Sequence, residues 1–184
     1  KGLLLVLGFM VLYKLGDNMA TALSMPFYLD LGFSMSEIGW VAKHAALWPA
    51  VFGGLVGGLI MVRLGINRAL WLFGVVQLVS ILGFALLASV GAKLWLLAAV
   101  IAFEYLGVGM GTAAFTAFIA RETSRVYAAA QFALFTALAA VPRTLVNAST
   151  GIIVEKIGWV DFFYMCTIIA IPGMVLLIWV APWN

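Results

Sequence analysis

The sequence predicts an all-α fold, a polytopic membrane helix bundle of six transmembrane helices, and composition and run length carry this prediction. Hydrophobic residues make up 66% of the 184 residues and charged residues only 9%, whereas soluble domains contain about 25% charged residues. The apolar residues form runs of about 20 or more, the length that a helix needs to cross a hydrocarbon core of about 30 Å. Transmembrane barrel strands are short alternating segments instead, so a helix bundle is expected.

The expected helices cover nearly the whole chain, so little of it is left for a soluble domain. They are predicted at residues 3–29, 37–62, 69–90, 94–120, 127–150 and 160–180, with short polar or glycine-bearing segments between them. The chain begins at Lys1 and not at Met. We therefore expect a segment of a longer protein.

The basic residues predict how the helices are oriented. With the amino terminus inside, the inner side holds Lys1, Arg63, Arg68, Arg121 and Arg125, while the outer loops hold Lys93 and Lys156 beside four acidic residues. Positive residues concentrate on the cytoplasmic side of membrane proteins, so both termini are expected in the cytoplasm. The net charge of +3 does not indicate nucleic acid, because the basic residues form no stripe.

A short pattern occurs twice and predicts an internal repeat. Residues 58–65 and 151–158 both read G-x-x-x-x-(basic)-x-G and start 93 residues apart. Since three crossings separate them, they should lie on opposite membrane faces, in inverted three-helix units of about residues 1–92 and 93–184. Such inverted repeats build each six-helix half of a major facilitator transporter. The first copy also resembles the cytoplasmic loop signature of that superfamily, although Val62 stands where an Asp is expected.

Lys14 and Asp17 stand inside the first apolar run, where each charge opposes insertion by about 2.5 to 3.5 kcal/mol. Their spacing puts them on one helical face, which continues through Asn18 and Thr21. One interpretation is a structural ion pair between helices. The other is a water-filled substrate path, the usual role of ionisable groups inside a membrane.

Two more ionisable residues fall in the middle of predicted helices. Glu104 precedes Gly107 and Gly111, whose G-x-x-x-G spacing is typical of close helix packing. Arg143, beside Pro142, must face a cavity, an acid or a ligand anion. We favour an anionic substrate group over a structural partner such as Asp17 or Glu104.

The sequence offers little support for an enzyme or a metal site. The one histidine, His44, and its neighbour Lys43 either face the interior or reach toward the membrane interface. No second histidine or acidic cluster stands at ligand spacing, Cys166 has no partner for a disulfide, and no prosthetic group is indicated.

Several stretches together resemble one transporter family. These are Tyr13-Lys-Leu-Gly-Asp17, Lys43, Arg63-Leu, Arg68-Ala-Leu-Trp-Leu-Phe-Gly74, Gln77, Phe103-Glu104-Tyr, Gly109 to Phe115, Gln131 to Leu134, Ala139 to Arg143, Gly151, Glu155 and Gly158-Trp159. In order and spacing they resemble the carboxyl-terminal six-helix half of the AmpG muropeptide permease family, within the major facilitator superfamily. The sequence departs from that pattern at Val62, Pro142 and Asn147.

The resemblance implies a proton-coupled importer in the bacterial inner membrane. Its cargo would be N-acetylglucosaminyl-anhydromuramyl peptides for cell-wall recycling, with a link to β-lactamase induction, and its partners would be protons, membrane lipid and an amino-terminal half. Proton coupling would then fall to Asp17 or Glu104, with Lys14 as a basic partner. Arg143 and Lys43 would bind carboxylates, and sugar or amide contacts would come from Tyr13, Asn18, Thr21, Gln131 and Asn147.

Three other functions were considered for the same residues. A carrier of the same fold for another anionic substrate, such as acetyl-CoA, would also use Arg143 and Lys43. A purely structural membrane subunit would use the polar faces for assembly. An intramembrane enzyme would need a serine with a histidine in a helical core or paired metal ligands, and the sequence shows neither arrangement.

Overall fold

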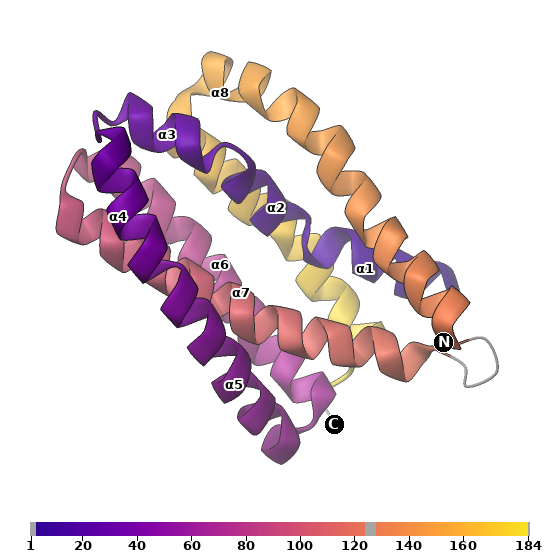
Figure 1. The fold of residues 1–184 in the computed structure, drawn as a ribbon. Helices are drawn as coiled ribbons and strands as arrows, with labels where there is room; N and C mark the ends of the chain where they lie inside the picture. The colour runs from indigo at the N-terminus through magenta and orange to yellow at the C-terminus, as the bar shows by residue number, and fades with distance from the viewer. Residues whose placement is uncertain (1–2, 124–127, 184) are drawn as a thin grey trace.

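The computed structural model describes residues 3–123 and 128–183, and this part of the chain contains helices and no strand. The helices are α1 (Leu3–Tyr13), α2 (Leu15–Ala22), α3 (Ser24–Asp30), α4 (Met35–Ala45), α5 (Leu47–Leu64), α6 (Ile66–Val90), α7 (Leu94–Glu122) and α8 (Ala128–Val180). Figure 1 shows them side by side as a bundle.

Five stretches of the described residues are long and apolar enough to cross a membrane. They are Leu4–Asp30, Met35–Leu64, Ile66–Val90, Leu94–Glu122 and Ala148–Val180. The predicted membrane helix bundle is therefore confirmed, and the protein is a multi-pass membrane protein. The sixth crossing, expected at residues 127–150, stays a prediction, as do the two repeat boundaries.

Two of the predicted helices are interrupted, and proline explains both interruptions. The first span breaks at Leu23, three residues before Pro26, and the second breaks at Ala46, three residues before Pro49. Proline has no N–H to donate to the carbonyl four residues earlier, so the carbonyls of Ala22 and Ala45 lose their helical partners. The first span also has a turn at Lys14. This run therefore contains α1, α2 and α3 in place of one continuous helix.

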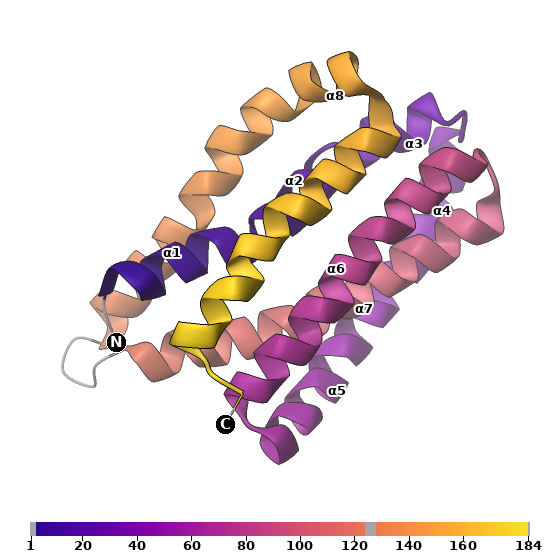
Figure 2. The ribbon, with the colours of Figure 1, turned by 180° about the vertical axis from the view of Figure 1, so that it is seen from behind.

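Glycines with positive φ end the long helices. Gly65 follows α5 with φ 81° and ψ 162°, and Gly158 turns α8 back on itself with φ 79° and ψ 170°. These are the final glycines of the two sequence patterns, and they share one backbone conformation that side-chain-bearing residues rarely adopt. Figures 1 and 2 place the two turns at opposite ends of the bundle.

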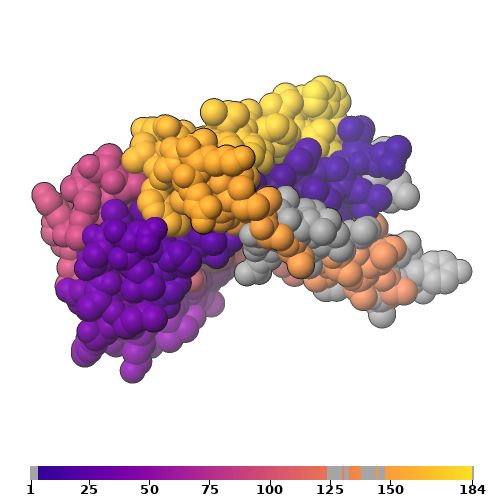
Figure 3. Space-filling view, turned by 90° about the horizontal axis from the view of Figure 1, so that it is seen from above, coloured from indigo at the N-terminus to yellow at the C-terminus, as the bar shows by residue number. Residues whose placement is uncertain are grey.

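Packing joins the first and last helices of the chain. α5 packs on α7, α1 and α2 pack on α8, and α6 lies between α7 and α8. The side chains of Trp48, Phe52, Leu55 and Leu59 on α5 remain exposed, as expected where a membrane protein contacts lipid. In Figure 3 the purple surface of α4, the pink surface of the α6–α7 connection and the amber surface of α8 adjoin one another.

The carboxyl-terminal end of α8 is tied to the start of α6. Trp71 Nε1 donates to the carbonyl of Ala181 at 2.9 Å, Asn67 Nδ2 to that of Pro182 at 3.1 Å, and Arg68 Nε to that of Trp183 at 3.0 Å. Arg121 of α7 joins this end through a 2.7 Å hydrogen bond to Asn67 Oδ1. The three backbone carbonyls belong to the residues that directly follow α8, so these hydrogen bonds fix that segment against α6.

Candidate functional site

A thin polar layer divides the interior of the bundle. One apolar cluster, around Phe9, Phe73 and Phe118, occupies the half that contains the described chain ends. A second, around Phe27, Phe84 and Phe163, occupies the other half. Between them along the helices stand four buried polar residues, Asp17, Gln77, Ser80 and Glu104. Polar groups are costly to place between two apolar regions unless they interact with one another or serve a function.

The predicted ion pair exists within this layer. Lys14 Nζ lies 3.3 Å from Asp17 Oδ2, and the two side chains are only 13% and 8% exposed. Thr21, one turn further, donates its hydroxyl to the carbonyl of Asp17 at 2.8 Å. The turn at Lys14, directly before α2, lets both charges share one face of the broken first span.

Glu104 is the second acid of the layer, and it is more deeply buried than Asp17. Its residue is 1% exposed. Neither carboxylate oxygen has a hydrogen-bond partner of good geometry among the described residues, although the Asp17 carboxyl and the Ser80 hydroxyl are close enough to interact with it. The Ser80 hydroxyl donates instead to the carbonyl of Gln77 at 2.8 Å.

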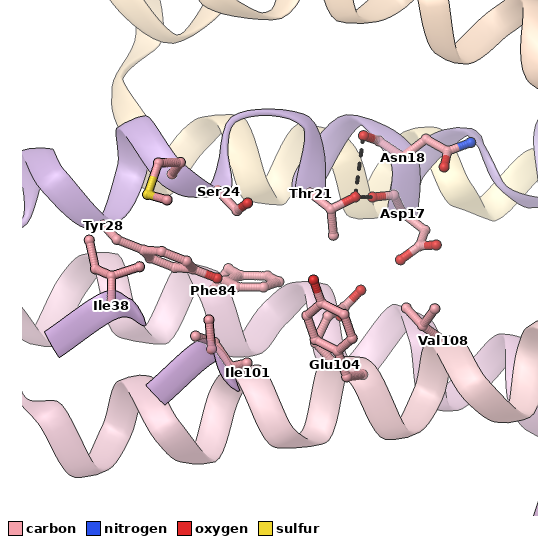
Figure 4. A pocket seen from close by; sticks show the side chains of 13 residues that line it. Asp17, Asn18, Thr21, Ser24, Tyr28, Ile38, Phe84, Ile101, Glu104 and Val108 are labelled. Atoms are coloured by element: carbon pink, nitrogen blue, oxygen red, sulfur yellow. Dashed lines mark hydrogen bonds between the residues drawn. The ribbon is translucent and has the colours of Figure 1, made fainter. Parts of the chain in front are cut away.

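The two acids border one cavity. It has a volume of about 390 Å³ and is enclosed by α2, α3, α4, α6 and α7. Its polar lining consists of Asp17, Asn18, Thr21, Ser24, Tyr28, Glu104 and Tyr105. Figure 4 shows Asp17 and Glu104 pointing toward each other from α2 and α7. Such a cavity can hold water, protons and part of a polar ligand in the middle of a membrane protein.

Gln77 and Ser80 on α6 are the members of the layer that the site prediction missed. Gln77 fills the space left by Gly107 and Gly111, because a Cβ at Gly111 would stand 2.7 Å from Gln77 Nε2. The G-x-x-x-G on α7 therefore admits a buried amide, where the sequence predicted close packing of a neighbouring backbone. The sequence signal that could have identified them is the spacing of Gln77 and Ser80, two polar residues three positions apart in the apolar run of α6.

The structure brings together some of the predicted site residues and separates others. Asn18 and Thr21 line the cavity with the two acids. Tyr13 lies in the apolar core, where its hydroxyl donates to the carbonyl of Leu70 at 2.8 Å. Lys43 is exposed on the outside of α4, beside Trp40 and His44. The side chains of Gln131, Arg143 and Asn147 lie outside the described residues, so their expected roles stay predictions.

Among the described residues, no three or more His, Cys, Asp or Glu side chains lie together so that they could hold a metal ion.

Comparison with known proteins identifies several relatives, while no family model matches the chain. An uncharacterized protein of Haemophilus influenzae is 50% identical over 192 residues, which cover 99% of this chain and 45% of the relative. The anhydromuropeptide permease of Escherichia coli is 40% identical over 175 residues, 95% of this chain and 36% of the permease. A putative transporter AmpG 1 of Rickettsia prowazekii is 34% identical over 176 residues, 96% of this chain and 40% of that protein. The chain thus spans less than half the length of these relatives.

Proposed function

The chain is a homologue of the AmpG permeases over nearly all its residues, and we propose that it is the carboxyl-terminal half of a proton-coupled importer of anhydromuropeptides. The importer resides in the bacterial inner membrane, with both ends of this segment in the cytoplasm. An amino-terminal half, on the same chain or a separate one, completes the path. The imported products serve cell-wall recycling and, through it, β-lactamase induction.

The observation that carries the proposal is the pair of buried acids on one polar cavity. Asp17 and Glu104 face each other in the interior of a membrane protein, between two apolar clusters. A purely structural bundle gains little from this arrangement, because a buried ion pair is often no more stabilising than apolar residues of the same volume. A transporter needs a site that exchanges a proton within reach of a polar ligand.

The cavity also fits the chemistry of the proposed cargo. Its hydroxyl and amide groups, from Asn18, Thr21, Ser24 and Tyr28, suit a sugar and a peptide, which present hydroxyls and amides of their own. At about 390 Å³ it is near the lower limit for sites that bind drug-sized ligands. A disaccharide peptide therefore extends toward the other half of the transporter. Arg143 is proposed to bind its carboxylates, whereas Lys43 lies outside the cavity.

Uptake of a labelled anhydromuropeptide tests this proposal. We expect cells that produce the complete transporter to take up the label in a gradient-dependent manner. Asp17→Asn should reduce uptake by about tenfold or more, equivalent to roughly 1.4 kcal/mol or more of lost coupling energy. Asp161→Asn, which changes an exposed acid of α8, is the matched control and should leave uptake unchanged.

The outcomes separate the competing functions. Absence of uptake by the unmodified transporter would overturn the muropeptide proposal and favour another anionic substrate such as acetyl-CoA. Unchanged uptake with Asp17→Asn, at equal membrane abundance, would make the Lys14–Asp17 pair structural. Loss of assembly in Asp17→Asn would favour a structural subunit.

A further inference from the structure

Among the side chains that the structure describes, the charges around the cavity do not balance. Lys14 contributes one positive charge, and Asp17 and Glu104 contribute two negative charges when all three groups are ionised. The layer then carries one uncompensated negative charge between two apolar clusters. A single bound proton makes it neutral. Two carboxylates that face each other also repel when both are ionised, which is a second reason for one of them to bind a proton.

The position of Lys14 distinguishes the two acids. Its ammonium group lies 3.3 Å from Asp17 and so favours the ionised form of that carboxyl. For Glu104 the hydrogen-bond geometry is different, since neither of its oxygens has a well-placed donor within the described part of the chain. An ionised carboxylate without donors is among the most costly groups to bury.

The other described groups around Glu104 add no further cation. Asp17 on α2 and Tyr28 on α3 face it across the cavity, and Tyr105 follows it on α7. From α4 the cavity receives Ile38 and Ala42, and from α6 it receives Phe84. Within the described part of the chain, Lys14 is thus the cation that acts on both acids, and it is already paired with Asp17.

Two hydrogen-bond donors that could stabilise an ionised Glu104 lie nearby, but neither donates to it. The Ser80 hydroxyl donates to its own helix, at the carbonyl of Gln77. The side-chain amide of Gln77 lies against α7 between Gly107 and Gly111, and its Nε2 has no acceptor among the described residues. A neutral carboxyl group leaves these donors unused. Loss of its proton would draw the Ser80 hydroxyl toward it, because a hydroxyl can rotate to a new acceptor.

We propose that Glu104 is the one proton site of this layer, with Ser80 as the donor that receives its ionised form, while Asp17 stays ionised beside Lys14. In this proposal, a proton binds to Glu104 and leaves it in each transport cycle. The transport role rests on the proposed function, whereas the position of the proton does not.

Infrared spectroscopy of the purified complete protein tests the position of the proton without any substrate. The carbonyl band of a protonated carboxyl group should be present near neutral pH and disappear at alkaline pH. Glu104→Gln should abolish the band. The matched control Glu122→Gln changes a glutamate at the far end of α7 and should preserve it.

A double variant tests whether Asp17 contributes to the band, because Asp17→Asn alone would leave Lys14 as a buried charge without its partner. Lys14→Gln with Asp17→Asn removes both charges of the ion pair together and should preserve the Glu104 band. Ser80→Ala should retain the band but shift its titration toward higher pH, since the ionised form loses a donor. Loss of the band in the double variant, its persistence in Glu104→Gln, or its absence from the unmodified protein would each overturn the proposal.

Transport measurements then connect the site to function. Gradient-driven accumulation of labelled anhydromuropeptide should fall about tenfold or more in Glu104→Gln and stay unchanged in Glu122→Gln. If the unmodified protein carries no muropeptide but shows the expected band pattern, the proposed cargo is wrong and the proton site stands. If it carries muropeptide and Glu104→Gln still accumulates it, the cargo stands and the proton site is wrong.

Discussion

Lys14 and Asp17 stabilise each other in a place where neither is stable alone. Both side chains are almost fully buried, and removal of one partner of a buried pair costs about 3 to 5 kcal/mol because it leaves an uncompensated charge. Lys14→Gln alone should therefore lower the free energy of unfolding by about 3 kcal/mol. Thermal unfolding of the purified protein in detergent measures this loss.

The double variant Lys14→Gln with Asp17→Asn provides the control. It leaves no buried charge in the pair, and its stability should return to within about 1 kcal/mol of the unmodified protein. A destabilisation of the double variant that equals the sum of the two single-variant effects would mean that the two residues contribute to stability independently.

Sequence reasoning found both buried acids but only part of their surroundings. Charges inside an apolar run are conspicuous, so Asp17, Glu104 and Lys14 could be predicted from the penalty on membrane insertion. Ser80 and Gln77 are uncharged and carry a much smaller penalty, so the sequence alone did not distinguish them from other polar residues of the helices. The family resemblance implied a sugar or amide contact for Tyr13, but its ring packs on Phe9 and Phe115.

Glycines along α5 determine how closely that helix approaches α7. Gly57 is buried, and a Cβ there would stand 2.8 Å from Met110 Cα, whereas a Cβ at the adjacent Gly58 would meet nothing within 4 Å. Gly57→Ala should therefore destabilise the protein by about 1 to 3 kcal/mol through overpacking. Gly58→Ala should be neutral or stabilising by up to about 1 kcal/mol, since alanine favours helices more than glycine does.

This pair of substitutions is closely matched, because the two glycines are neighbours and receive the same added methyl group. Thermal unfolding in one detergent compares them directly. Equal stability of the two variants would contradict the packing of α5 on α7.

The positions of the helices could be predicted more accurately than their continuity. Long apolar runs and glycines determined the ends near Gly65 and Gly91, and α7 ends within two residues of the expected boundary. The breaks at Leu23 and Ala46 follow from Pro26 and Pro49, but an apolar run that contains proline can also kink without breaking. Which of these happens depends on packing by neighbouring helices, and the sequence does not reveal it.

The arrangement of the whole molecule predicts which turns face the cytoplasm. The α3–α4 turn and the α5–α6 turn lie at opposite ends of the bundle (Figure 1), and the exposed residues Met35 and Leu64 mark them. With both termini in the cytoplasm, a membrane-impermeant maleimide should label Met35→Cys in intact cells. Leu64→Cys should react only after the membrane is opened.

The single native cysteine of this segment, Cys166, is buried, so the segment gives little background in this experiment. The complete protein should first be freed of other exposed cysteines. Labelling of Leu64→Cys in intact cells, with Met35→Cys protected, would reverse the proposed orientation.

The hydrogen bonds from Trp71, Asn67 and Arg68 to three backbone carbonyls have a practical consequence for labelling the whole molecule. Ala181, Pro182 and Trp183 are hydrogen-bonded to side chains of α6. A domain fused after these residues would therefore have a fixed attachment point, which the proposed topology places on the cytoplasmic side. A fluorescent domain attached there through a short rigid linker would turn with α6 and would not swing freely. Its polarised emission could then report the tilting of this half during transport, in single molecules and in real time.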